Sequence, residues 1–99
     1  MSKKTFSYEE AVALLPEVQR LTADAYEQVE AIAEDAVEDY QLIVGKWAAD
    51  IIRMGIEVKG LWLIDFDAGS GYYCWRHPES SLQYFHGYDE GFDGRVKLN

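Results

Sequence analysis

The chain has 99 residues, of which 48% are hydrophobic and 14% aromatic, and its formal net charge is −9. This composition is typical of a folded globular domain and excludes a disordered tail, and the length suits a single domain over residues 1–99. The negative charge repels phosphate backbones and anionic membrane surfaces. We therefore expect neither nucleic acid nor a membrane as a partner.

The cysteine content and the N-terminus bear on the compartment. Cys74 is the single cysteine, so no intramolecular disulfide can form, which fits a reducing environment. No apolar stretch of the signal-peptide kind follows the first residues, and no run approaches the ~20 apolar residues of a membrane span. These features predict a cytoplasmic protein.

A capping box predicts where the first helix begins. In Ser7-Tyr8-Glu9-Glu10 the Ser7 hydroxyl can accept from the amide of Glu10, and the Glu10 carboxylate can accept from the amide of Ser7. Pro16 lacks an amide and disfavours helical geometry at Leu15. The sequence therefore predicts a short helix over residues 8–14, followed by a break or a kink.

Residues 16–54 carry apolar side chains at steps of three and four, from Val18 to Met54, and Gly55 has the position of a left-handed cap. Two arrangements are open. One continuous helix would be roughly 55–60 Å long and would need a second chain to cover it. Two helices, with a new start between Asp35 and Glu38, would bury their apolar faces against each other, and we favour this hairpin.

Three aromatic runs, 61–66, 72–76 and 82–86, are separated by turn-forming residues and predict an antiparallel meander. Turns centred near Gly69 and Glu79 set Ile64, Cys74 and Tyr84 abreast. The predicted fold class is α+β. An N-terminal helical hairpin, a short helix plus two longer ones over about 7–54, packs on a three-stranded β-meander with a C-terminal loop, about 58–99.

Both faces of this sheet are rich in large apolar groups, although a slip of one residue would exchange the faces of a strand. In the predicted register one face carries Trp62, Ile64, Phe66, Tyr72, Cys74, Arg76, Leu82, Tyr84 and His86, and the other carries Leu61, Leu63, Asp65, Tyr73, Trp75, Gln83 and Phe85. The helices can cover only one face. For the other we expect a second subunit first, the C-terminal tail second and a small-molecule pocket third.

Three residues could in principle share a metal ion, namely Cys74, His77 and His86. In the meander His77 lies beside a turn, and His86 lies about five residues further along, roughly 16 Å away. Because zinc needs all its ligands at ~2 Å, we expect no metal site and no cofactor, and we interpret Cys74 as a small apolar core residue.

The segment from His86 to Arg95 is the densest polar part of the chain. Its histidine, three carboxylates and arginine could supply a general base and an anion clamp, but solvated turns explain the same pattern more simply. No residue is placed as an activated nucleophile, so we predict no catalytic residue. In the predicted register the Arg76 guanidinium can lie over Trp62. Asp65 needs a partner if it is buried, and Arg95 is one candidate.

Several pieces in order along the chain together resemble a bacterial family, the domain-of-unknown-function family 2203. They are Phe6-Ser7, Glu9-Glu10-Ala11, Leu14-Leu15-Pro16, Ile64-Asp65-Phe66, Cys74-Trp75-Arg76, Glu79, Phe85-His86 and Gly91-Phe92-Asp93-Gly94-Arg95. The resemblance implies no activity, cofactor or catalytic residue. It directs attention to a candidate ligand-binding set, Asp65, Arg76, Glu79, His86 and Arg95.

The doubly apolar strands and the absence of a catalytic constellation predict a non-enzymatic protein-interaction or assembly module. We expect a homodimer joined through the helices or the uncovered sheet face, with a further protein partner as an open alternative. The rival prediction is a small-molecule binder or minor enzyme, in which Arg76 and the segment from His86 to Arg95 hold an anionic ligand.

Overall fold

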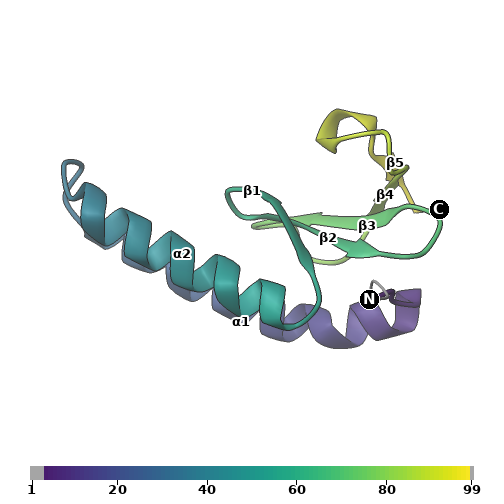
Figure 1. Cartoon of the computed structure of the whole chain (residues 1–99), viewed down its shortest axis with the longest axis horizontal. Helices are drawn as coiled ribbons and strands as arrows, with labels where there is room; N and C mark the ends of the chain where they lie inside the picture. Colours follow the sequence, from purple (N-terminus) through teal and green to yellow (C-terminus); the bar gives the residue numbers. More distant parts are fainter. Residues whose placement is uncertain (1–3, 99) are drawn as a thin grey trace.

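The computed structural model describes residues 4–98, which form a helical layer beneath one face of an antiparallel sheet (Figure 1). The helices are α1 (Tyr8–Ala31) and α2 (Val37–Arg53). The strands, in both chain order and sheet order, are β1 (Glu57–Gly60), β2 (Leu63–Asp67), β3 (Tyr72–Arg76), β4 (Tyr84–His86) and β5 (Val96–Lys97). A short 3₁₀ helix, Phe92–Gly94, precedes β5. The α+β class is confirmed.

The first helix begins as predicted but does not stop at the proline. Both hydrogen bonds of the capping box are present, from the Glu10 amide to the Ser7 hydroxyl and from the Ser7 amide to the Glu10 carboxylate. The predicted short helix over residues 8–14 is wrong, because α1 continues through Pro16 to Ala31. Pro16 and Val12 are both exposed, so water can serve the Val12 carbonyl that the proline leaves without a helical donor.

A hairpin of two helices, rather than one long helix, fills the region after Pro16. The chain leaves the helical conformation at residues 32–36 and returns antiparallel as α2. The Trp47 indole nitrogen donates to the buried Thr22 hydroxyl at 2.9 Å, which ties the two helices together. Gly55 has φ +85°, in the left-handed region predicted for it. In Figure 1 the tip of this hairpin projects well beyond the edge of the sheet.

The sheet has five strands, not the three predicted, because β1 and β5 were missed. Both are short, and neither contains an aromatic residue. The β1–β2 turn falls at Leu61 and Trp62, which were predicted to begin a strand. Trp62 has φ 63°, in the left-handed region where a large side chain is rare, so the residue itself does not indicate a turn. The indole is held by packing against Trp47, with ring centroids 5.0 Å apart.

The register between β2 and β3 differs by one residue from the prediction, whereas Cys74 faces Tyr84 as expected. Asp65, and not Ile64, lies opposite Cys74. Four residues, 68–71, connect the strands, so the centre of the turn falls between Gly69 and Ser70 rather than on Gly69. The slip exchanges the faces of β2: Ile64 and Phe66 join the core on the helical side, and Asp65 joins Cys74 on the other face.

The face opposite the helices, here called the open face, is therefore less apolar than expected. Part of the C-terminal segment lies against it, where the ring of Tyr88 packs 5.0 Å from that of Tyr72. This covering corresponds to the second of the three alternatives weighed from the sequence. Within residues 4–98, neither helix combines the length and the apolar character of a membrane span.

Candidate functional site

Three neighbouring strands bring Asp65, Cys74 and His86 together on the open face. Asp65 in β2 is paired directly with Cys74 in β3, and His86 in β4 is paired with Tyr72, two residues from Cys74. The three side chains are buried, with exposed fractions of 1%, 1% and 4%. Their ligand atoms (a carboxylate oxygen, the sulfur and a ring nitrogen) all lie within 4.8 Å of one another. We call these residues the Asp65–Cys74–His86 cluster.

Hydrogen bonds hold the histidine but leave the aspartate incompletely satisfied. His86 Nε2 lies 2.9 Å from Asp65 Oδ2, and His86 Nδ1 lies 2.9 Å from the carbonyl of Gly87. Asp65 Oδ1 is buried, and no nitrogen or oxygen donor in the described part of the chain reaches it; besides His86, the carboxylate interacts with the Cys74 thiol, which is a weak donor. An orphaned buried carboxylate oxygen is costly and uncommon in folded proteins.

Burial dominates the electrostatics of the cluster. It raises the pKa of the Asp65 carboxyl, although Cys74 and His86 nearby act in the opposite direction. Burial, reinforced by the adjacent Asp65 carboxylate, raises the pKa of the Cys74 thiol to about 12, while Arg95 opposes the shift. Cys74 is therefore a protonated thiol at neutral pH and a poor nucleophile.

A cavity of about 230 Å³ opens onto the cluster. Besides the cluster, its wall includes Lys59 from β1, Tyr72 from β3, and Tyr88 and Glu90 from the C-terminal segment. The Lys59 ammonium lies 3.1 Å from Glu57 and 4.3 Å from the centre of the Tyr72 ring. The Tyr88 hydroxyl donates to Asp67 at 2.5 Å. The cavity is thus lined by polar groups that other side chains hold in place.

The remaining predicted residues form a second group beside the cavity. Arg95 Nη1 lies 2.8 Å and 3.1 Å from the two carboxylate oxygens of Glu79, which also accepts from the Arg76 amide at 2.9 Å. The Arg95 guanidinium lies 3.9 Å from the centres of the Tyr84 and Phe92 rings. This arrangement anchors the C-terminal segment to the β3–β4 turn.

Two predicted pairings are wrong. The Arg76 guanidinium lies 5.3 Å from the Phe92 ring, whereas the Trp62 indole is buried with Trp47 on the helical side. Because the register of β2 against β3 is shifted by one residue, Arg76 and Trp62 do not share a face of the sheet as predicted. The buried partner of Asp65 is His86, and Arg95 pairs with Glu79 instead.

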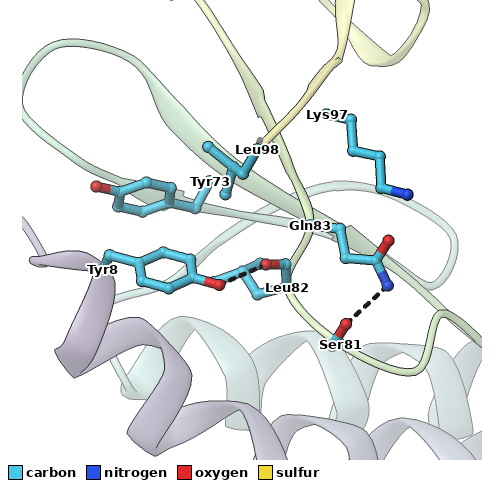
Figure 2. A pocket seen from close by; sticks show the side chains of 7 residues that line it. All are labelled: Tyr8, Tyr73, Ser81, Leu82, Gln83, Lys97 and Leu98. Carbon is cyan, nitrogen blue, oxygen red and sulfur yellow. Dashed lines mark hydrogen bonds between the residues drawn. The ribbon is translucent and has the colours of Figure 1, made fainter.

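A second depression, of about 440 Å³, lies between the start of α1 and the β4–β5 edge (Figure 2). Its wall is formed by Tyr8, Tyr73, Ser81, Leu82, Gln83, Lys97 and Leu98. Figure 2 shows the Tyr8 hydroxyl bonded to the Leu82 carbonyl, at 2.9 Å, so this polar group is already satisfied. None of the predicted site residues lies here, and the wall offers no cluster of acid, thiol and imidazole groups.

A family model described as an uncharacterized conserved protein, DUF2203, matches residues 33–98, about two thirds of the chain. The chain belongs to the DUF2203 family. The matched region of this DUF2203 protein contains α2, the sheet, the cluster and all five predicted site residues. No curated protein and no solved structure matches the chain.

The DUF2203 sequence holds a signal for the cluster in the length of the turn between β2 and β3. Asp65 stands out in the sequence as an acid within an apolar strand, and His86 as the end of another strand, whereas the predicted meander gives no reason to join Cys74 to Asp65. The structure packs His77 against Tyr26 of α1, with ring centroids 5.0 Å apart, on the helical side of the sheet. A four-residue turn between β2 and β3 would have placed Asp65 beside Cys74.

Proposed function

We propose that this DUF2203 domain is a non-enzymatic assembly module that forms a homodimer through an exposed face of α2. The observation that carries this proposal is an apolar stripe on that helix, formed by Leu42, Gly45, Ala49 and Ile52. Leu42 is 72% exposed and Ile52 is 58% exposed, which is unusual for such large apolar side chains on a helix whose other face is already packed on α1.

The spacing of the stripe suits a second copy of the same chain. The steps between its residues are three, four and three, so the pattern reads the same in both directions along the helix. A two-fold axis near Trp47 would set Leu42 against the partner's Ile52 and Gly45 against the partner's Ala49. Interfaces with two-fold symmetry need this self-complementarity.

The centre of the stripe permits close approach of two helices. A side-chain carbon placed on Gly45 would meet no other atom within 4 Å, so the surface there is open. Ala49 is exposed and adds a single methyl group. Both basic residues of α2, Lys46 and Arg53, pair with Asp50 at the edge of the stripe, which reduces the local repulsion between two acidic chains.

The geometry of the cluster supports the non-enzymatic part of the proposal. Both ring nitrogens of His86 lie 2.9 Å from oxygen atoms of the protein, so a substrate would have to displace one of these contacts to exchange a proton with the ring. The pKa of Cys74, about 12, keeps the thiol from acting as a nucleophile at neutral pH.

Native mass spectrometry and light scattering over a concentration series would test the dimer. We expect a dimer for the natural chain and a monomer for Leu42→Glu, because the substitution places two like charges in an apolar contact and weakens association by at least about 100-fold. The matched control is Val12→Glu, an exposed apolar position on α1 that should leave the dimer intact. A monomer at every concentration, or a dimer that survives Leu42→Glu, would refute the proposal.

A second candidate function is the binding of a small anion beside Arg95. It is supported by the position of the Arg95 guanidinium, whose face stacks on the rings of Tyr84 and Phe92 while its Nη1 donates to the Glu79 carboxylate. An anion would have to replace the Glu79 carboxylate. Titration with inorganic phosphate, followed by NMR of the arginine side chains, should shift the Arg95 signal, and more strongly in Glu79→Gln. No shift in either protein would refute this role.

A further inference from the structure

We propose that the Asp65–Cys74–His86 cluster binds one zinc-class divalent metal ion through three protein ligands, beside the cavity. This goes beyond assembly through α2, and it revises the expectation that the chain holds no metal site. The cluster lies on the open face and the stripe lies on the outer surface of α2, so either can be lost without the other.

The donor set selects the class of ion. One carboxylate, one cysteine sulfur and one imidazole are the ligand types of zinc and its neighbours, which accept mixed oxygen, sulfur and nitrogen donors. The sulfur binds as the thiolate, so the ion must displace the proton that Cys74 keeps in the metal-free chain. Calcium and magnesium need about six oxygen ligands, and the cluster offers one carboxylate. Cobalt(II) accepts tetrahedral sites with the same ligand types and can serve as a coloured probe.

The spacing of the donors suits a tetrahedral ion. Metal–ligand bonds of about 2.0 Å to nitrogen and oxygen and about 2.3 Å to sulfur put ligand atoms roughly 3.3–3.5 Å apart. The three donors lie within 4.8 Å of one another, so the most widely spaced pair would have to close by up to roughly 1.3 Å to reach this spacing. The 2.9 Å between His86 Nε2 and Asp65 Oδ2 would have to widen by a few tenths of an ångström. Rotation about the side-chain bonds is sufficient for such adjustments.

The hydrogen bonds point to a cation between His86 and Asp65. The Gly87 carbonyl can only accept, so the Nδ1–H of His86 donates to it, and Nε2 turns toward the Asp65 carboxylate. In this neutral tautomer two acceptors face each other at 2.9 Å, and a proton or a metal ion must lie between them. A backbone carbonyl on the second ring nitrogen is the usual outer support of a metal-bound histidine.

Asp65 Oδ1 supplies an independent observation. It belongs to a side chain that is 99% buried, and no nitrogen or oxygen donor among the described residues reaches it, although the Cys74 thiol, a weak donor, interacts with the carboxylate. A divalent ion held by the carboxylate would satisfy it. The cations that act on the cluster, Lys59 and Arg95, pair with Glu57 and Glu79 respectively, and Arg95 also interacts with the Cys74 sulfur.

The test is a titration of the chelator-treated full chain with cobalt(II), followed by displacement with zinc. We expect one ion per chain and an absorption spectrum with the sulfur-to-cobalt charge-transfer band of tetrahedral coordination. Cys74→Ser should remove that band and weaken binding by at least about 10-fold, since even the loss of an outer-shell partner costs that much. The matched control, His77→Gln, changes the other histidine and should leave both the spectrum and the affinity unchanged.

Circular dichroism of each variant shows whether it is folded. If a variant is unfolded, its titration is replaced by thermal unfolding with and without zinc, measured on the natural chain and on the milder variant Asp65→Asn. We expect zinc to raise the melting temperature of the natural chain only. Binding without the charge-transfer band, or with an affinity unaffected by Cys74→Ser and Asp65→Asn, would place the ion on surface acids and overturn the proposal. So would the absence of binding.

Discussion

His86 Nε2 lies 2.9 Å from Asp65 Oδ2, and both side chains are almost fully buried although 21 residues separate them in the chain. The contact joins β4 to β2 across β3, which lies between them in the sheet. It therefore ties the C-terminal part of the sheet to its centre. The loss of either side chain should lower the free energy of unfolding, because the other is then left buried without its partner.

Removal of the histidine should cost more than removal of both partners. His86→Ala leaves the Asp65 carboxylate buried without its partner, and we expect the free energy of unfolding to fall by about 3 kcal/mol. Adding Asp65→Leu to that variant should restore about half of the loss, because the buried charge is gone. Urea unfolding of both single variants and the double variant measures the energetic coupling between Asp65 and His86. Additive losses would show that their contact is not the source of the destabilisation.

Alkaline pH should destabilise the metal-free protein through Cys74. The ordinary thiol pKa is 9.0, and burial raises the pKa of Cys74 in the folded chain to about 12. Between these values the unfolded chain loses the proton and the folded chain keeps it, so stability falls as pH rises, by up to about 4 kcal/mol over the whole window. Below pH 9 the thiol is protonated in both states, so the full stability is present there.

Cys74→Ala is the control for that pH profile. Tyrosine ionisation affects both proteins alike, so the difference between the natural chain and the variant isolates the thiol. Urea unfolding in the presence of a chelator should show this difference changing steadily in the variant's favour above pH 9. A constant difference would mean that the thiol ionises equally in the folded and unfolded chains.

The Trp47–Thr22 hydrogen bond should stabilise the helical hairpin. Thr22→Val keeps the shape of the side chain but leaves the buried indole N–H without its acceptor, so we expect a loss of about 1–3 kcal/mol. Thermal unfolding monitored by circular dichroism measures it. Thr22→Val should cost much less in a Trp47→Phe background, where no N–H remains, and an equal cost in both backgrounds would contradict this explanation.

The Arg95–Glu79 pair should control the order of the C-terminal segment more than global stability. Arg95→Ala removes the ion pair and the stacking on Phe92, and we expect faster amide hydrogen exchange over residues 88–97 with a global loss of only about 1–2 kcal/mol. Lys97→Ala, an exposed cation in the same segment, is the matched control. Unchanged exchange in Arg95→Ala would show that other contacts hold the segment.

The sequence alone determined the start of α1, because the capping box is a local pattern of hydrogen-bonding groups, and it determined the α+β class, because apolar periodicity is local too. The same periodicity left one long helix and a hairpin both open, and only the length of the single helix favoured the hairpin. It also indicated Asp65 and His86, since an acid inside an apolar strand and a histidine at a strand end are visible without coordinates. The helix end predicted at Pro16 is wrong because the cost of a proline within a helix depends on whether water reaches the carbonyl that loses its donor, here that of Val12.

Tertiary structure alone decided the rest. Trp62 occupies a left-handed turn because its indole is held by Trp47, which is distant in the chain. Whether Ile64 or Asp65 faces Cys74 depends on a single residue in the turn, and the core settles it by taking Ile64 and Phe66 onto the helical side. A strand alternates its faces at every residue, so this one-residue shift brings acid, thiol and imidazole together in one buried cluster.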